Sequence, residues 1–480
     1  MIPANNGDTI CAIATPPGTG AIAIIRISGA DAITICDGVF SPKKKNFRLI
    51  NATTHSIHFG TIQNEHGLLD EVLVSVFRAP HSYSGEDSIE ISCHGSSYIQ
   101  QKIVELLISK GARLAKPGEF TLRAFINRKF DLSQAEAVAD LIAAASQSAH
   151  DLAIDQMRGG FSMRISGLRK ILIDFASLIE LELDFSQEDV EFVDRRDLIK
   201  ILVEIKSEIQ RLVSSFSYGN VLKTGIPVAI IGKPNVGKST LLNAILNEER
   251  AIVSEIPGTT RDTIEDTIII HNYAFRFIDT AGLRHSTDRI ESEGIERTYE
   301  KIRQAKIVLY VFDVNHAESE ELRAWAHGGM EAWAYGSGED LSADRRLPTA
   351  DQKTFILIAN KSDLLEETPS HLKELLEEQC IFISAKRKEN INLILERLVD
   401  IVKEMQIQDI TVVSNARHFE ALTGTLKAID AVMTGLSSNL SVDLITVDLR
   451  TALYHLGEIT GEITTDDILG NIFGRFCIGK

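Results

Sequence analysis

The chain has 480 residues, of which 44% are hydrophobic, and it carries a formal net charge of −17. This composition supplies enough apolar side chains for real hydrophobic cores, and the length predicts roughly two to four domains. The negative charge excludes a protein that coats nucleic acid by bulk attraction, so any contact with RNA must use a local basic patch or a partner.

The cysteines predict a reducing, cytoplasmic environment. They are odd in number and contain no CxxC pair, which argues against a disulfide framework. Their positions are Cys11, Cys36, Cys93, Cys380 and Cys477. No apolar run approaches membrane-spanning length, and the N-terminus lacks the pattern of a signal peptide. Cys477 lies four residues from the end, as prenylation requires, but the Gly in CIGK replaces the aliphatic residue of that signal, so lipidation is rejected.

Residues 1–118 alternate short β-rich runs with Gly/Pro turns, which predicts a small α+β domain. The expected strands are 9–14, 21–28, 72–77 and 88–93, and the expected helix is 98–112. The run GTGAIA matches the dinucleotide fingerprint formally, but a strand pattern follows it instead of a helix, so a Rossmann site is rejected. His81, His94 and Cys93 lack paired ligand spacing, and a turn histidine is favoured over a metal site.

The pattern becomes helical at residues 119–217 and again at 407–480. A long helix is indicated by apolar residues at alternating spacings of three and four. These residues are Ile165, Leu168, Leu172, Phe175 and Ile179. After 407, helices are expected over 416–433 and 444–459.

Strands and helices alternate from 218 to 406. The strands 227–231, 275–278, 306–312, 354–359 and 380–383 are apolar on both faces, which predicts a central parallel sheet covered by helices. The chain is thus expected to be multidomain, with an α/β P-loop domain of Ras-like type inserted into a discontinuous α-helical domain. The Gly-rich, polar segment 324–352 is expected to be a surface loop and has no assigned role.

The run GKPNVGKST, residues 232–240, follows an expected strand and opens an expected helix, as a phosphate-binding P-loop requires. Gly232 and Gly237 let backbone N–H groups close around phosphate oxygens. Lys238 can reach the β- and γ-phosphates, and the Ser239 hydroxyl can bind Mg²⁺. The alternative is a chance glycine-rich turn.

The run NKSD, residues 360–363, distinguishes GTP from ATP. It follows a strand, so it lies at the same edge of the sheet as the phosphate loop. The Asp363 carboxylate can accept hydrogen bonds from the ring N–H and the amino group of guanine, while Lys361 packs along the base and Asn360 braces the loop. The run SAK, residues 384–386, offers a backbone N–H to the guanine carbonyl. Alone, NKSD could be an ordinary surface loop.

The run PGTTRD, residues 257–262, lies where a switch loop senses the γ-phosphate. Thr260 would supply the second hydroxyl on Mg²⁺, Asp279 would hold Mg²⁺ through water, and the Gly282 N–H would sense the γ-phosphate. The chain is therefore expected to bind GTP. The residues expected at GTP are Asn235, Val236, Gly237, Lys238, Ser239, Thr240, Ser254, Glu255, Ile256, Pro257, Gly258, Thr259, Thr260, Asp279, Thr280, Ala281, Gly282, Asn360, Lys361, Asp363, Ser384, Ala385 and Lys386.

Leu283 follows DTAG at the position where Ras-type GTPases carry a Gln that orients the attacking water. The complete motif set resembles the translation-factor-like GTPases, several of which carry an apolar residue there and depend on potassium. A monovalent cation can compensate the charge between the β- and γ-phosphates. The Asn235 side chain with the loop residues Ser254, Ile256 and Thr259 would hold it. A plain turn residue is the alternative for Asn235.

The flanking sequences are more specific than any P-loop. The runs DTICAIATPPGTGAIAIIRISG, PHSYSGEDSIEISCHG, KPGEFTLRAFINRKFDLSQAEAVADLI and FGRFCIGK closely resemble the MnmE (TrmE) family of tRNA-modification GTPases, over essentially the whole chain. The departures are the 324–352 insertion and DFSQED, where the family usually has a Pro after the Phe.

The resemblance implies a homodimer joined through an N-terminal domain with a folate-binding-like fold. That domain would bind 5-formyl- or 5,10-methylene-tetrahydrofolate as a one-carbon donor, through Arg26, Glu86, Lys129 and Lys480. With GTP and K⁺ bound, the two G domains would meet. Glu291 would then position the attacking water through a second water; a solvated carboxylate at a helix start is the alternative.

The resemblance also implies a partner, an FAD- and NADH-using protein of the MnmG (GidA) type that forms a heterotetramer with this chain. Together they would add an aminomethyl or carboxymethylaminomethyl group to C5 of the wobble uridine of certain tRNAs, with no membrane or DNA involved. Cys477 resembles the required C-terminal cysteine of the family, and it is either a catalytic thiol or a small buried apolar residue. The rival functions are a ribosome-assembly GTPase and a nucleotide-gated scaffold whose folate domain is vestigial.

Overall fold

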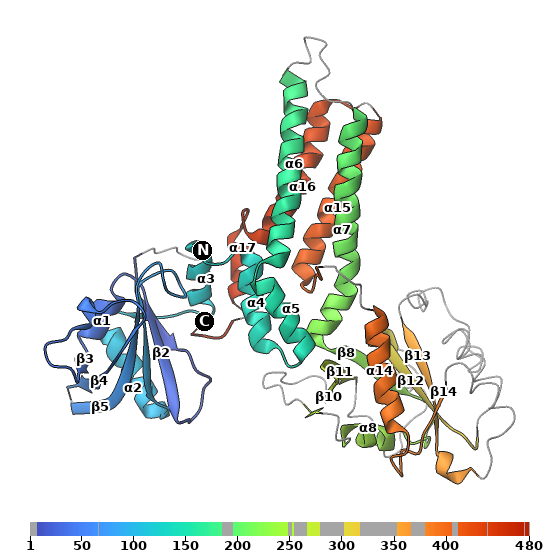
Figure 1. The fold of residues 1–480 in the computed structure, drawn as a ribbon, viewed down its shortest axis with the longest axis horizontal. Helices are drawn as coiled ribbons and strands as arrows, with labels where there is room; N and C mark the ends of the chain where they lie inside the picture. Colours follow the sequence, from blue (N-terminus) through green and yellow to red (C-terminus); the bar gives the residue numbers. More distant parts are fainter. Residues whose placement is uncertain are drawn as a thin grey trace. The chain divides into compact units, whose positions relative to one another are not determined.

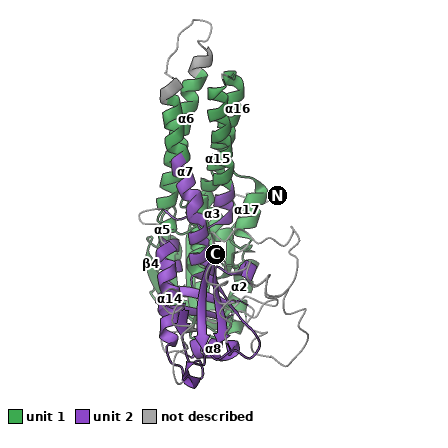
Figure 2. Cartoon of the chain, turned by 90° about the vertical axis from the view of Figure 1, so that its right-hand side faces the viewer, with its two compact units in different colours: residues 1–142, 155–206, 421–480 green, residues 143–154, 207–420 purple. Residues whose placement is uncertain are grey.

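The computed structural model describes most of the chain: residues 7–65, 67–184, 195–247, 252–253, 266–278, 302–316, 353–365, 380–405, 411–438, 440–474 and 476–479. It forms two compact units (Figure 2). Unit 1 comprises Met1–Ile142, Asp155–Lys206 and Ala421–Lys480, and unit 2 comprises Ala143–Ile154 and Ser207–Glu420. Helix α7 (Arg195–Thr224) runs through the expected boundary at 217/218. The division of the chain into four domain segments stays a prediction.

Unit 1 contains a seven-stranded sheet in the order β3-β4-β5-β6-β2-β1-β7. Its neighbours are antiparallel, except that β7 runs parallel to β1. The strands are β1 (Ile10–Ile13), β2 (Ile22–Ser28), β3 (Phe40–Pro42), β4 (Ser56–Asn64), β5 (Gly67–Phe77), β6 (Ser88–His94) and β7 (Arg113–Leu114). The four expected strands are confirmed within longer or shorter bounds, and β3, β4 and β7 were not predicted. Strand β2 confirms the strand, in place of a helix, that was expected after GTGAIA.

One face of this sheet forms the core of the domain. Helices α1 (Ala32–Asp37) and α2 (Ser97–Ser109) pack on it (Figure 1), and α2 confirms the helix expected over 98–112. Ile25 and Ile27 of β2 are fully buried in that core. Successive side chains of a strand point to opposite faces, so Arg26 lies on the other face of the sheet.

The helical part of unit 1 contains α3 (Glu119–Ile126), α4 (Leu132–Ala143), α6 (Gly160–Asp184), α16 (Val442–Thr460) and α17 (Asp466–Phe473). Helices α6 and α16 lie alongside each other (Figure 1). All five apolar residues of the expected stripe on α6 are buried, which confirms the predicted helix and its inner face. Helices α5 (Gln147–Met157) and α15 (Ala416–Ser437), like α7, contribute to both units.

Unit 2 contains a second seven-stranded sheet in the order β14-β13-β12-β8-β11-β10-β9. The strands are β8 (Ile226–Ile231), β9 (Ile252–Val253), β10 (Asp266–Ile270), β11 (Tyr273–Phe277), β12 (Ile307–Asp313), β13 (Thr354–Asn360) and β14 (Cys380–Phe382). The five expected strands are parallel, as predicted. The sheet differs from the prediction in that two more strands extend it at one edge: β10 forms an antiparallel hairpin with β11, and β9 pairs antiparallel with β10.

The two faces of this sheet bury different residues of the same strands. Val228 and Ile230 of β8 join a core with α8 (Lys238–Leu246) and α14 (Ile391–Met405), whereas Ala229 and Ile231 join a separate core on the other face. A strand that is buried on both faces has a continuous run of apolar residues. This is why the sequence predicted a sheet covered by helices.

None of the helices in the described part of the chain combines the length and the apolar character needed to cross a lipid bilayer.

Candidate functional site

The phosphate loop leaves the end of β8 and enters α8. Gly232 has φ +144° and Gly237 has φ +101°, both in the region that favours glycine. A Cβ on Gly232 would lie 2.0 Å from the carbonyl oxygen of Val311, and one on Gly237 would lie 2.3 Å from Nδ2 of Asn360. Both glycines are therefore required by backbone conformation and by close contact with the neighbouring strands β12 and β13.

The Lys238 ammonium lies over this loop. Its Nζ donates to the carbonyl oxygens of Gly232 at 2.8 Å and Lys233 at 2.7 Å. Ser239 is half-buried at the start of α8, while Asn235 is exposed with φ +62°, a conformation that asparagine tolerates better than most residues. This conformation suits the turn reading of Asn235 and leaves its side chain accessible to a cation.

Asn360 connects three loops at the carboxyl ends of the strands. Its side chain is almost fully buried, at 3% exposure. Nδ2 donates to the carbonyl oxygen of Val236 in the phosphate loop at 2.8 Å, and Oδ1 accepts from the backbone N–H of Ala385 at 3.0 Å. The NKSD loop, the phosphate loop and the SAK loop are thus fixed to one another through a single amide, as a bracing role for Asn360 requires.

Asp363 lies beside the SAK loop. Its carboxylate accepts a hydrogen bond from Oγ of Ser384 at 2.8 Å, and Nε of Arg387 is 3.6 Å from its other oxygen. The Ser384 hydroxyl also accepts from the backbone N–H of Arg387 at 3.2 Å. Sequence reasoning assigned only a backbone role to the SAK loop and missed the Ser384 side chain, which orients the carboxylate.

Lys361 has a partner that the sequence analysis missed. Its Nζ pairs with Oδ2 of Asp313, the last residue of β12, at 2.7 Å. Burial would raise the pKa of Asp313, but the hydrogen bond and charge of Lys361 together with hydrogen bonds from Asn315 outweigh burial and hold this pKa below its usual range. The available signal was an acidic residue at the carboxyl end of a strand, the edge where ligands of parallel sheets bind.

Several expected site residues lie outside the described residues. They are Ser254, Glu255, Ile256, Pro257, Gly258, Thr259, Thr260, Asp279, Thr280, Ala281, Gly282, Glu291 and Lys480, together with the segment 324–352. Their roles stay predictions.

A second polar site lies in unit 1, where Arg26 projects from the face of its sheet opposite α1 and α2. Its Nε and Nη2 donate to Oε1 of Glu90 on β6 at 2.9 and 2.8 Å. The guanidinium carbon is 5.1 Å from the ring centroid of Tyr83 and 5.6 Å from that of Phe120. These contacts fix Arg26 beside the loop 82–86, where Glu86 lies.

The same loop carries Glu86 and lies against the segment that contains Lys129. The Glu86 carboxylate accepts from Oγ of Ser28 at 2.8 Å and from Nη1 of Arg123 at 3.1 Å. Lys129 Nζ is exposed and donates to the carbonyl oxygen of Pro80 at 3.0 Å. Three of the four residues expected at the folate therefore gather around one loop.

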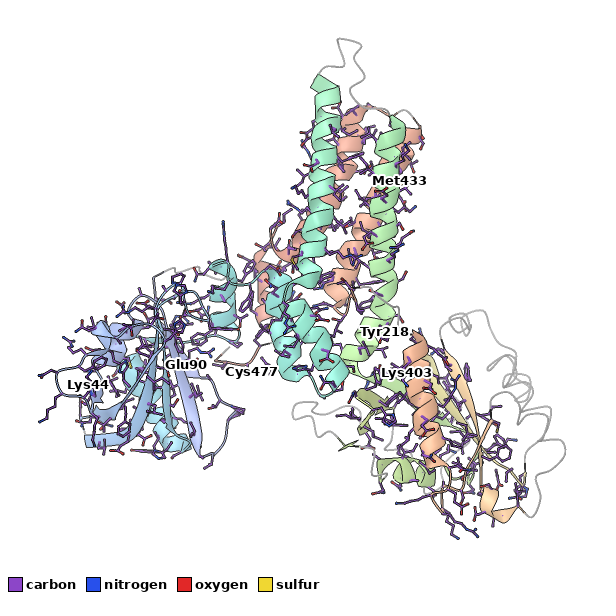
Figure 3. All side chains as sticks on the ribbon, viewed as in Figure 1. Lys44, Glu90, Tyr218, Lys403, Met433 and Cys477 are labelled. Atoms are coloured by element: carbon purple, nitrogen blue, oxygen red, sulfur yellow. The ribbon has the colours of Figure 1, made fainter. Side chains whose placement is uncertain are left out.

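The C-terminal tail reaches the same region. Nη1 of Arg26 is 3.4 Å from the carbonyl oxygen of Gly479, and the backbone N–H of Gly118 is 3.4 Å from the carbonyl oxygen of Cys477. A Cβ on Gly479 would lie 2.2 Å from the carbonyl oxygen of Ile13, so this position accepts only glycine. The Cys477 side chain is exposed (Figure 3), which excludes the reading of this residue as a buried apolar cysteine.

The described residues contain no group of three or more His, Cys, Asp or Glu that could hold a metal ion. His94 instead donates its backbone N–H to the buried carboxylate of Asp70 at 2.8 Å, and its Nδ1 is 2.7 Å from the same carboxylate. His94 is the last residue of strand β6, so it is not the turn histidine that the sequence favoured.

Comparison with known proteins covers both units. Residues 9–129 match the family model "GTP-binding protein TrmE N-terminus", and residues 132–477 match "MnmE helical domain". The tRNA modification GTPase MnmE of Christiangramia forsetii is 51% identical over 488 residues, covering 98% of this chain and 99% of its own. That of Bacteroides fragilis is 51% identical over 483 residues, covering 99% and 100%.

Among solved structures, the FeoB G domain of Methanococcus jannaschii is 22% identical, covering 37% of this chain and 98% of its own, with a TM-score of 0.23. The family models and the full-length relatives instead account for nearly every residue. This chain belongs to the MnmE family of tRNA modification GTPases.

Proposed function

We propose that this tRNA modification GTPase is activated by potassium and dimerisation. With a flavoprotein partner of the MnmG type, it adds an aminomethyl or carboxymethylaminomethyl group to C5 of the wobble uridine, using a tetrahydrofolate one-carbon donor. The observation that carries GTP as the nucleotide is the Asn360 amide, which joins the phosphate loop to both loops expected to read guanine. Adenine offers no pair of donors matching the Asp363 carboxylate, so this assembly favours GTP over ATP.

The phosphate loop also carries residues that could bind the proposed Mg²⁺ and K⁺ ions. Ser239 lies at the start of α8, where its hydroxyl could bind Mg²⁺ and the helix N-terminus favours phosphate, and Thr260 and Asp279 would complete the Mg²⁺ site. The exposed Asn235 would hold K⁺ with the switch-loop residues. When bound, the two ions would supply positive charge for the phosphates. This chain would need the help of these ions, because Leu283 cannot orient the attacking water as a Gln does.

The polar site of unit 1 supports the folate proposal. Glu86 presents a carboxylate, Arg26 a guanidinium and Lys129 an exposed ammonium around one loop, and a folate carries both an aminopyrimidinone edge and carboxylates that such groups recognise. When bound, the folate would supply the one-carbon unit. The exposed Cys477 thiol, on a tail fixed by Gly118 and Arg26, is accessible for a covalent role.

The test is transfer of isotope from labelled methylene-tetrahydrofolate to tRNA by the full chain with its flavoprotein partner and GTP. We expect label in tRNA with wild type, loss of label with Cys477→Ser and retention of GTP hydrolysis by that variant. Cys380→Ser, a half-buried thiol of unit 2, is the matched control and should transfer label normally. Absence of transfer by wild type would favour a nucleotide-gated scaffold, and full transfer by Cys477→Ser would remove the covalent role of Cys477.

A further inference from the structure

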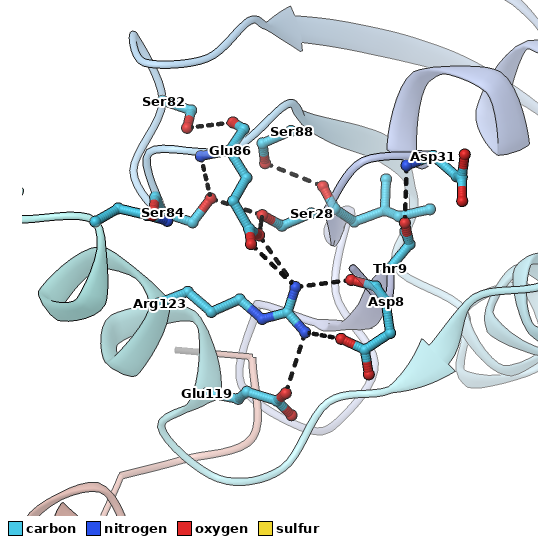
Figure 4. Close-up of polar contacts among 12 residues, drawn as sticks. Asp8, Thr9, Ser28, Asp31, Ser82, Ser84, Glu86, Ser88, Glu119 and Arg123 are labelled. Carbon is cyan, nitrogen blue, oxygen red and sulfur yellow. Dashed lines mark hydrogen bonds and ion pairs between the residues drawn. The ribbon is translucent and has the colours of Figure 1, made fainter. Parts of the chain in front are cut away.

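Arg123 on α3 is the centre of a largely buried polar cluster (Figure 4). Its side chain is only 10% exposed. Nη1 donates to the backbone carbonyl of Asp8 at 2.9 Å and to Oε2 of Glu86 at 3.1 Å, and Nη2 donates to Oδ1 of Asp8 at 2.6 Å and to Oε1 of Glu119 at 3.3 Å. One guanidinium therefore links the N-terminal segment, the Glu86 loop and its own helix.

The charges in the cluster explain why a second arginine is present. Three carboxylates, those of Asp8, Glu86 and Glu119, converge on Arg123. Arg113 pairs with Asp8 at 2.7 Å and with Glu119 at 2.6 Å, and so compensates the two carboxylates farther from the loop. Arg123 reaches these two and also Glu86. The orientation of Glu86 is therefore coupled to Arg123 directly.

The pKa shifts agree with a cluster of ionised groups. Burial would raise the pKa values of Asp8 and Glu119. The hydrogen bonds and charges of the two arginines, with the backbone N–H of Lys116 at Glu119, together outweigh burial and hold both pKa values below their usual range. At neutral pH both groups are therefore charged. Removal of Arg123 would leave carboxylates facing one another in a partly buried space, where repulsion is strong.

The remaining contacts of Glu86 leave its carboxylate little freedom. Its backbone N–H donates to Oγ of Ser84 at 3.3 Å, and its carbonyl oxygen accepts from Oγ of Ser82 at 2.5 Å. The Ser84 and Ser28 hydroxyls are 2.6 Å apart, and Ser28 donates to the Glu86 carboxylate. Main chain and side chain are thus held together, with Arg123 as the one charged group of the described contacts to Glu86.

We propose that Arg123 is a positioning residue that holds the Glu86 carboxylate ready for the aminopyrimidinone edge of the folate. This inference rests on the proposed folate site. The edge carries a ring N–H and an amino group, two parallel donors that match one correctly turned carboxylate. A carboxylate fixed beforehand loses less conformational entropy on binding. An arginine suits the task because its planar fork serves several acceptors at once, which a lysine ammonium cannot do in the same geometry.

The test measures the affinity of the full chain for 5-formyltetrahydrofolate by calorimetry, in a double-mutant cycle of Arg123→Met and Glu86→Gln. We expect Arg123→Met to weaken binding about tenfold or more, as for loss of a charged hydrogen bond. In the Glu86→Gln background the same change should alter affinity less than about twofold, because Arg123 acts through Glu86. A residue that only stabilises the domain would weaken binding equally in both backgrounds, and that result would overturn the inference.

Two further variants keep the test decisive. Arg48→Met is the matched control, since Arg48 pairs with Asp37 at another place in the same domain, and it should bind normally. If Arg123→Met unfolds at too low a temperature, Arg123→Lys keeps the positive charge at this position. We expect its affinity for the folate to lie between those of wild type and Arg123→Met, and the loss to depend again on Glu86. Wild type that fails to bind, or Glu86→Gln that binds normally, would contradict the folate site itself; normal binding by Arg123→Met beside a weakened Glu86→Gln would contradict only the role of Arg123.

Discussion

Asp363 and Glu86 lie in different units, yet each carboxylate accepts a hydrogen bond from a serine hydroxyl and has an arginine beside it. Asp363 has Ser384 and Arg387, and Glu86 has Ser28 and Arg123. Guanine and the folate ring share an edge with a ring N–H and an amino group. The same recognition problem, two parallel donors, is therefore met at both proposed sites by an oriented carboxylate.

Ser384→Ala should weaken GDP binding about five- to tenfold, because it removes one hydrogen bond that orients the Asp363 carboxylate from a buried position. The measurement is a fluorescence titration with a labelled GDP. Ser214→Ala is the matched control, since Ser214 is exposed and its hydroxyl bonds only to its own helix among the described contacts. Unchanged affinity of Ser384→Ala would remove the orienting role of this hydroxyl.

The cysteines should differ sharply in reactivity. Cys477 is exposed, whereas burial raises the pKa values of Cys11 and Cys93 to about 11 and that of Cys380 to about 12. Because the thiolate is the nucleophile, these three remain protonated thiols at pH 8. Brief treatment with iodoacetamide, read by peptide mass spectrometry, should modify Cys477 first. Equally fast modification of Cys11 would show that the tail does not present Cys477 as described.

At the scale of elements, glycines and single polar side chains hold segments that are distant in sequence. Gly232 allows β8 to approach β12, and Asn360 at the end of β13 holds the phosphate loop. In unit 1 the backbone N–H of Gly118 contacts the carbonyl oxygen of Cys477 in the C-terminal tail. The described phosphate loop and the C-terminal tail are thus held in place by contacts with segments distant in sequence.

Helix α6 offers a paired test of its buried stripe. Leu172 is fully buried, and its neighbour Ile171 is 45% exposed. Leu172→Ala should lower the free energy of unfolding by about 2 to 5 kcal/mol and the melting temperature by several degrees, because it leaves a cavity. Ile171→Ala should change the melting temperature little. Differential scanning fluorimetry compares them, and equal shifts would mean that α6 does not bury the face assigned to it.

At the scale of the whole molecule, the sequence predicted the elements better than the contacts between them. Apolar runs located the parallel strands, and three-four spacing located α6, because periodicity records which face is buried. The antiparallel strand β10 and the edge strand β9 were missed, although DTIII and YAFRF flank a short turn at 271–272. The roles of Ser384, Asp313 and Arg123 could not be read from sequence, because their partners lie 21, 48 and up to 115 residues away.

Because Leu283 cannot orient the attacking water as a Gln does, the proposal that potassium activates GTP hydrolysis is central to how the whole chain would work: K⁺ would compensate charge on the phosphates, and Glu291 would position the water. The most direct measurement is the initial rate of GTP hydrolysis by the full chain in KCl and in NaCl at equal ionic strength. We predict a rate at least about tenfold higher in KCl, as expected for a cation that compensates charge on the phosphates. Equal rates in the two salts would contradict the account.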